Sequence, residues 1–121
     1  MKHKINQEGK DWIKKKDYEK KIIFSPGDFR EPGHQLQIIS IPPHTKQRFH
    51  SHAIQTEVYY ILEGECLISI EKKEFLAKPG DAFMTHPGDL HNLWNRSDKD
   101  FKLIVFKINY PLNDEDTMWR E

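Results

Sequence analysis

Short apolar or alternating stretches, separated by frequent turn residues, run through most of this chain. From Gly33 onward they cover residues 34–41, 45–52, 57–62, 65–70, 74–77, 82–85, 90–95 and 101–108. One further short strand is expected over residues 22–25, where Pro26-Gly27 ends it. Strands this short, interrupted this often, are typical of a β-sandwich or a β-barrel. The pattern therefore predicts an all-β domain.

The two ends of the chain lack this pattern. Residues 1–24 are rich in lysine, and their large anchors are few, chiefly Trp12, Ile13 and Tyr18. We interpret them as an N-terminal arm that packs on a barrel formed by residues 25–110. Residues 111–121 are an acidic C-terminal tail that either docks on the barrel or frays.

Composition excludes several classes of function. Lys plus Arg and Asp plus Glu both number 19, so a nucleic-acid partner is not expected. A single cysteine cannot form an internal disulfide, which agrees with a cytoplasmic location. No apolar run approaches the roughly 18 residues of a membrane span, and the lysine-rich start does not resemble a secretion signal.

The candidate chemistry lies in one histidine-rich stretch and a second stretch downstream. His50 and His52 project to the same face of an extended strand, roughly 6.6 Å apart, and can share a metal ion. Glu57 follows His52 by five residues, so the chain must bend between them if Glu57 is to face the same interior. His91 follows a Pro-Gly turn and completes a possible set of three histidines and one carboxylate.

These two stretches resemble the paired motifs of the cupin superfamily. The positions that agree in order and spacing are His50, His52, Glu57, Gly64, Gly80, Gly88, His91 and Asn95. Two positions depart from the motifs: His44 replaces a glycine, and His86 stands where a proline is expected. The resemblance implies a double-stranded β-helix, the cupin or jelly-roll barrel. It also implies one divalent transition metal per chain, bound by His50, His52, Glu57 and His91; Mn, Fe, Ni, Zn and Cu all remain open.

Strand alternation predicts a substrate-binding residue beside the metal. In an unbroken strand, Lys46, Arg48, His50 and His52 would face the same side. A guanidinium one pleat from a metal could bind a carboxylate or phosphate through two parallel hydrogen bonds. Alternatively, Lys46 lies at the rim and Arg48 pairs with an acidic residue of the barrel.

Three further residues are candidates for substrate binding or proton transfer. Tyr59 has the same strand parity as Glu57, so its hydroxyl can face the cavity or simply pack there. His44 and His86 flank proline-containing turns and could line the mouth of the site.

Two classes of function follow from these residues. The first is a small metalloenzyme of isomerase, lyase or oxygenase type that acts on an anionic metabolite such as a sugar acid, sugar phosphate or keto acid. The second is a metal-dependent binding or sensing module without turnover. In either case we expect a homodimer, with the strand at residues 22–25 available to pair with a neighbouring subunit.

Overall fold

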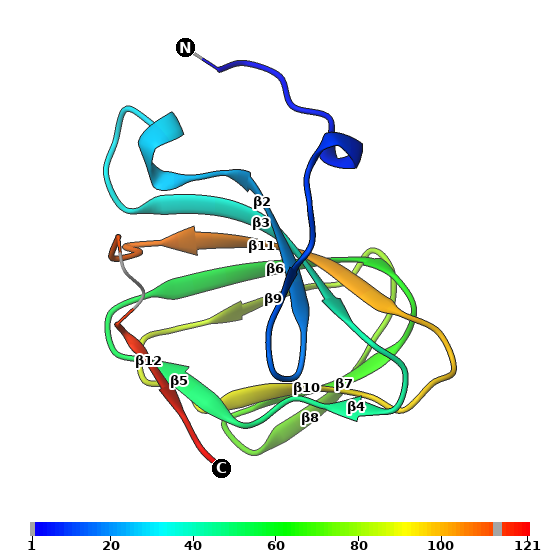
Figure 1. Ribbon diagram of the computed structural model, residues 1–121. Helices are drawn as coiled ribbons and strands as arrows, with labels where there is room; N and C mark the ends of the chain where they lie inside the picture. The colour runs from blue at the N-terminus through cyan, green and yellow to red at the C-terminus, as the bar shows by residue number, and fades with distance from the viewer. Residues whose placement is uncertain (1, 113–114) are drawn as a thin grey trace.

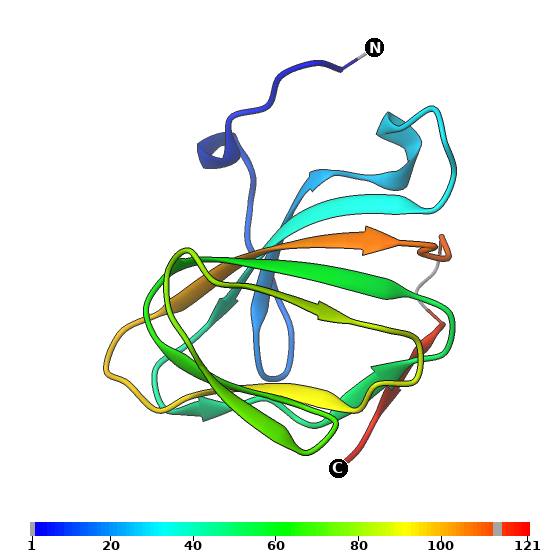
Figure 2. The same cartoon turned by 180° about the vertical axis from the view of Figure 1, so that it is seen from behind.

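Two antiparallel sheets face each other across a single core (Figures 1 and 2). This computed structural model describes residues 2–112 and 115–121. In spatial order the first six-stranded sheet contains β1 (Ile13–Lys14), β2 (Glu19–Phe24), β3 (His34–Ile41), β11 (Phe101–Ile108), β6 (Thr56–Glu63) and β9 (Ala82–Thr85). The second contains β12 (Thr117–Trp119), β5 (His50–His52), β10 (His91–Asn95), β7 (Cys66–Ile70) and β8 (Lys73–Ala77), and β4 (Thr45–Lys46) also pairs with β10. Two short 3₁₀ turns, Gln7–Gly9 and Pro26–Asp28, flank the first strands. The predicted all-β fold is confirmed.

One end of the barrel interior is apolar. Along β11 buried and partly exposed side chains alternate, so that Phe101, Leu103 and Val105 point between the sheets. Ile39 and Ile41 of the adjacent β3 join them. Full burial of side chains of this size contributes roughly 1.5–3 kcal/mol each. This end therefore holds the two sheets together.

Toward the other end of the barrel, the inward-facing positions of the same strands carry polar side chains. Gln35 and Gln37 on β3, Glu57 on β6 and Lys107 on β11 are all 5% exposed or less. Lys107 lies opposite Gln35 on one side and opposite Glu57 on the other. Buried polar side chains are costly unless they find partners. Their concentration at one end of the barrel marks the place where a polar ligand can be held.

The strand expected over residues 45–52 is interrupted. β4 ends at Lys46 and β5 begins at His50. Between them the Arg48 backbone N–H and its Nε both donate to Oδ2 of Asp17, each at 2.9 Å. Since this carboxylate binds the backbone N–H of Arg48, that group is not available to a strand ladder. The strands predicted at 34–41, 82–85 and 101–108 coincide with β3, β9 and β11.

Both chain ends contribute strands to the sheets. β2 starts at Glu19, earlier than the predicted strand, and pairs with β3 of its own chain. In the C-terminal tail, β12 pairs with β5, so the tail docks; residues 113 and 114 of the predicted tail lie outside the described part.

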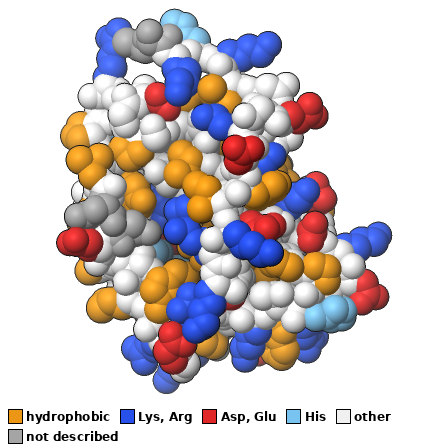
Figure 3. Space-filling model, in the orientation of Figure 1, with side chains coloured by type: hydrophobic (Ala, Val, Ile, Leu, Met, Phe, Trp, Pro, Cys, Tyr) orange, Lys and Arg blue, Asp and Glu red, His pale blue; other side chains and the backbone are white. Residues whose placement is uncertain are grey.

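Within residues 2–112 and 115–121 there is no helix of the length and apolarity needed to span a membrane. Positive and negative side chains are interspersed on the face shown in Figure 3, in keeping with a formal net charge of zero.

Candidate metal centre

Three histidines from adjacent strands meet at the polar end of the barrel. β5 supplies His50 and His52, and β10 places His91 directly opposite His50. One ring nitrogen from each lies within 4.8 Å of the other two, and all three side chains are buried. The bend predicted after His52 is present, because β6 begins at Thr56 and brings Glu57 to the same interior.

Hydrogen bonds orient the imidazole rings. Nδ1 of His50 lies 3.0 Å from the carbonyl oxygen of Arg48, and Nδ1 of His91 lies 2.8 Å from that of Asp89. A carbonyl only accepts, so each Nδ1 carries the proton and each Nε2 keeps its lone pair. The Nδ1 of His52 lies 3.0 Å from the hydroxyl oxygen of Thr117, on β12.

The Nε2 atoms, with their free lone pairs, are the ligand atoms that a divalent transition metal requires. Among the described residues, the buried Nε2 of His91 has no hydrogen-bond partner. Burial, followed by the proximity of His91, lowers the pKa of His50 to about 3, so this ring is neutral at physiological pH. Neutral imidazoles held through Nδ1 and presenting Nε2 are common ligands of Zn, Cu, Fe and Ni. The residues present therefore fit a metal ion.

Glu57 lies beside the histidine cluster and is neutralised by a lysine. Its Oε1 is 3.0 Å from Nε2 of His52 and 3.4 Å from Nε2 of His91, while its Oε2 is 2.9 Å from Nζ of Lys107. The Tyr59 hydroxyl also donates to Oε1, at 3.0 Å. Burial acts to raise the pKa of Glu57, but Lys107, together with the hydrogen bond from His52, outweighs it and holds this pKa well below its ordinary value. The carboxylate is therefore ionised, and its role as the fourth ligand stays a prediction.

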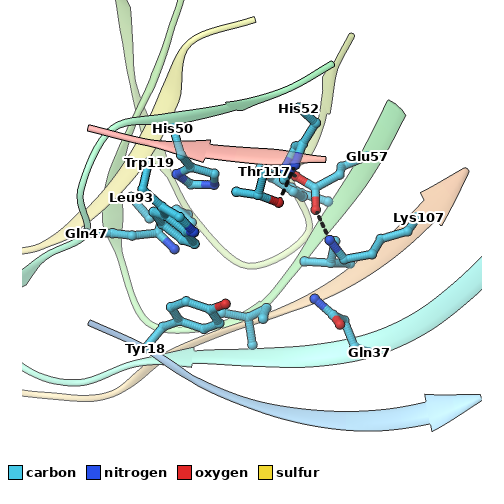
Figure 4. Close-up of a pocket in the computed structure, with 13 residues that line it drawn as sticks. Tyr18, Gln37, Gln47, His50, His52, Glu57, Leu93, Lys107, Thr117 and Trp119 are labelled. Atoms are coloured by element: carbon cyan, nitrogen blue, oxygen red, sulfur yellow. Dashed lines mark hydrogen bonds and ion pairs between the residues drawn. The ribbon is translucent and has the colours of Figure 1, made fainter. Parts of the chain in front are cut away.

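Two of the three histidines, His50 and His52, line a cavity of about 40 Å³ (Figure 4). This volume suits an ion together with roughly two or three water-sized groups. Polar side chains face it from both sheets, and two aromatic rings from near the chain ends, Tyr18 and Trp119, also line it, with Trp119 beside His50. The remaining lining residues are Gln37, Ile39, Gln47, Glu57, Tyr59, Leu93, Val105, Lys107 and Thr117.

The structure does not bring Arg48 into this cavity, so the expectation based on strand parity is wrong. Its guanidinium lies 4.3 Å from the ring centroid of Trp119, and it pairs with Asp17 at 2.9 Å and with Glu121 at 3.4 Å. The alternative pairing with an acidic residue describes its place better. The cause is the break between β4 and β5, which interrupts the alternation that would have aligned Arg48 with His50.

Of the other candidates, only Tyr59 faces the cavity. Lys46 is exposed and lies over the ring of Trp94, at 4.5 Å. His44 pairs with Asp98 at the surface, and His86 is exposed. None of these three side chains lines the cavity. The substrate-binding or catalytic roles of Tyr59, and those of the three residues outside the cavity, stay predictions.

Sequence reasoning missed Lys107, Thr117 and Trp119. The inward orientation of Lys107 could have been predicted from the sequence. It lies two residues after Val105 in the same strand, at the next position that faces the interior. The two tail residues could not be predicted in this way, since β12 is only three residues long and lies in a polar segment.

Comparisons with known proteins agree with this geometry. Residues 37–107 match the family model described as Cupin domain. An oxalate-binding protein of Thermotoga maritima is 30% identical over 70 residues, which are 58% of either chain. A solved structure of a predicted oxalate decarboxylase from Thermotoga maritima superposes with a TM-score of 0.78 at 22% identity, covering 88% of this chain and 98% of that one. KdgF from Halomonas sp. gives a TM-score of 0.77 at 19% identity, covering 90% and 94%.

Proposed function

Because this chain belongs to the cupin family and has the double-stranded β-helix fold, we propose that it is a small metalloenzyme acting on a small anionic metabolite. One divalent transition metal ion would bind His50, His52 and His91, with Glu57 as a fourth ligand. The observation that carries the proposal is the buried cluster itself, whose three ring nitrogens converge within 4.8 Å.

The charge of the cavity supports an anionic ligand. Glu57 and Lys107 form a neutral pair at 2.9 Å, and the three histidines add no charge in their neutral form. A divalent ion would bring an uncompensated positive charge into a buried site, and a small anion would offset it. Lys107, rather than Arg48, is then the cation nearest the ligand.

The size of the cavity favours a ligand of few atoms. A space of about 40 Å³ beside an ion holds only a few ligand atoms, such as the carboxylate end of a short carboxylic or keto acid. The names of similar proteins point to the same chemistry, since one is an oxalate-binding protein. We therefore place short mono- and dicarboxylates first among the anionic metabolites.

A bound metal would supply Lewis-acid polarisation of a ligand oxygen. The residues around it would handle charge and protons. Burial, followed by Glu57, raises the pKa of Tyr59 well above its ordinary value, so its hydroxyl stays protonated. Tyr59 therefore donates its hydroxyl hydrogen to Glu57, and Lys107 holds the same carboxylate from the other side.

The second candidate is a metal-dependent binding module without turnover. The observation that favours it is the name of the curated relative, which describes binding only. Both candidates share the metal site and the anionic ligand. They differ in whether the bound ligand is chemically changed.

One experiment separates the two candidates. Protein loaded with Mn²⁺, Fe²⁺, Ni²⁺ or Zn²⁺ is titrated calorimetrically with oxalate, pyruvate and glycolate, and the mixtures are then analysed for products with and without oxygen. Metal-dependent binding with product formation supports the enzyme. Binding without product supports the module, and absence of binding to any of these anions contradicts both.

We further propose that the protein is a homodimer joined through the outer face of the first sheet. Tyr60 and Leu62 on β6 and Met84 on β9 are between 40% and 48% exposed there. Val58, which lies opposite Met84, and Tyr60 occupy successive outward positions of β6. Exposed apolar groups that lie together on one face are typical of a protein interface.

A further inference from the structure

The three imidazoles differ in the kind of oxygen that holds their Nδ1. For His50 and His91 it is the backbone carbonyl of a residue two positions earlier in the chain. For His52 it is a side-chain hydroxyl from the far end of the sequence, Thr117, at 3.0 Å. Figure 4 shows this contact beside the Glu57 carboxylate. One of the three rings is therefore oriented by the C-terminal tail.

Strand pairing explains why the tail reaches this site. In the pairing of β12 with β5, Thr117 lies opposite His52, Met118 opposite Ser51 and Trp119 opposite His50. Alternation turns Thr117 and Trp119 toward the cavity, and leaves Met118 outside with 57% of its surface exposed.

Contacts at both ends hold this strand in place. Before it, the Asp116 carboxylate accepts hydrogen bonds from the backbone N–H groups of Ile54 and Gln55, at 3.0 and 3.1 Å. After it, the backbone N–H of Arg120 donates to the carbonyl of Phe49, at 2.8 Å.

Aromatic contacts fix the second inward residue of the strand. The ring of Trp119 lies 4.4 Å from the ring of His50, with the Arg48 guanidinium 4.3 Å from the indole and Tyr18 stacked on it at 6.1 Å. The strand is therefore a fixed wall of the histidine cluster.

We propose that β12 is part of the metal centre and that Thr117 is the positioning residue for His52. This inference rests on the metal site of the proposed function. With a metal on Nε2, the Nδ1–H of His52 donates to Oγ1 of Thr117. Without a metal, Nε2–H can donate to Glu57, and the hydroxyl can then donate to Nδ1. A hydroxyl can accept from Nδ1–H or donate to an unprotonated Nδ1, so it is compatible with both tautomers of His52. The carbonyls at His50 and His91 only accept, so they are compatible only with the tautomer that is protonated on Nδ1.

Removing the hydroxyl affects the metal-bound form more. A coordinated imidazole is a strong N–H donor, and without Thr117 this donor would be buried with no acceptor. The opposite tautomer, with Nε2–H bonded to Glu57 at 3.0 Å, would then compete with the metal for Nε2. Loss of a hydrogen bond of this kind typically weakens metal binding by about 10–100-fold.

The test compares Thr117→Val, Thr117→Ser and Met118→Ala in the full chain, with Zn²⁺ alone as the probe and a chelator as competitor. We expect Thr117→Val to bind Zn²⁺ about 10–100-fold more weakly than wild type. Thr117→Ser keeps the hydroxyl and should remain within about threefold, as should Met118→Ala, whose side chain points outward. Should the valine variant fail to fold, Thr117→Ala replaces it.

A second readout follows the hydrogen bond itself. In Zn²⁺-loaded wild type, the Nδ1–H proton of His52 should give an NMR signal protected from solvent exchange, which the serine variant retains and the valine variant loses. Equal Zn²⁺ affinity in the valine variant, or a serine variant as weak as the valine one, would overturn the role of Thr117. Failure of wild type to bind Zn²⁺ would instead contradict the proposed metal site.

Discussion

At the scale of single residues, the buried ion pair between Lys107 and Glu57 has a large energetic consequence. Both residues are 5% exposed or less, and their charged atoms are 2.9 Å apart. Removal of one member of such a pair leaves the other charge buried and uncompensated. We predict that Lys107→Met lowers the free energy of unfolding of the metal-free protein by about 3 kcal/mol or more, measured by urea denaturation.

Two controls accompany this prediction. Lys102→Met removes an outward-facing lysine of the same strand, which is 4.0 Å from Glu63, and should change the free energy of unfolding by less than about 1 kcal/mol. The double variant Lys107→Met/Glu57→Gln should recover much of the lost stability. Unchanged stability in the single variant would mean that Glu57 does not need its lysine.

His50 makes the stability of the metal-free protein depend on pH. Its pKa of about 3 in the folded state lies below the ordinary value of 6.5. Between these values the unfolded chain binds one more proton at this position, so stability falls as pH falls below 6.5. The expected contribution is about 2 kcal/mol lost between pH 8 and pH 5.

Glu57, with its depressed pKa, adds to this loss only below about pH 4.5. Denaturation of wild type and His50→Gln at several pH values isolates the histidine. The variant should show a shallower decline between pH 6.5 and 5. Identical pH profiles would contradict the assignment.

Residue patterns predicted the histidine cluster but not its surroundings. His50, His52 and His91 could be found because their spacing is local or belongs to a motif. The position of Arg48 could not, since it depends on the hydrogen bond that its backbone N–H donates to Asp17, 31 positions away. Lys107 could have been found from its parity, but a lysine facing the interior is improbable until a carboxylate is known to lie opposite.

At the scale of elements, the turn between β6 and β7 depends on glycine for two separate reasons. Gly64 has a φ of +85°, and a Cβ there would lie 2.7 Å from the carbonyl oxygen of Asp100. Gly80 has a similar φ of +94° but open space around it.

We predict that Gly80→Ala costs about 1–2 kcal/mol of unfolding free energy through backbone strain alone. Gly64→Ala should cost roughly 1–3 kcal/mol more, because the steric overlap adds to the strain. Chemical denaturation of the two variants side by side measures the difference. Equal losses would show that Asp100 moves away without cost.

Elements were predictable where alternation was long and uninterrupted. β3 and β11 each have eight residues, with alternating burial throughout β11 and as far as Ile39 in β3, and both match their predicted bounds. β1 and β12 have two and three residues, and only their pairing with β2 and β5 defines them as strands. Tertiary pairing of that kind leaves no periodic signal in the sequence.

At the scale of the whole molecule, the proposed homodimer can be tested through its exposed apolar face. Sedimentation at micromolar concentration should show a dimer for wild type. Tyr60→Lys places a charge at the centre of the proposed interface and should shift the protein to monomer. Ile13→Lys, at a 40% exposed position on the edge strand β1, serves as the control and should leave the dimer intact. A monomeric wild type would contradict the proposal.

The central claim is that the barrel holds one metal ion at His50, His52 and His91, and elemental analysis of the purified protein tests it most directly. We predict about one divalent transition ion per chain in wild type. His52→Ala should lower the metal content by about an order of magnitude or more, since it removes one of three converging nitrogens. Wild type that stays free of metal after incubation with Mn²⁺, Fe²⁺, Ni²⁺, Cu²⁺ or Zn²⁺, or full occupancy in His52→Ala, would contradict the account.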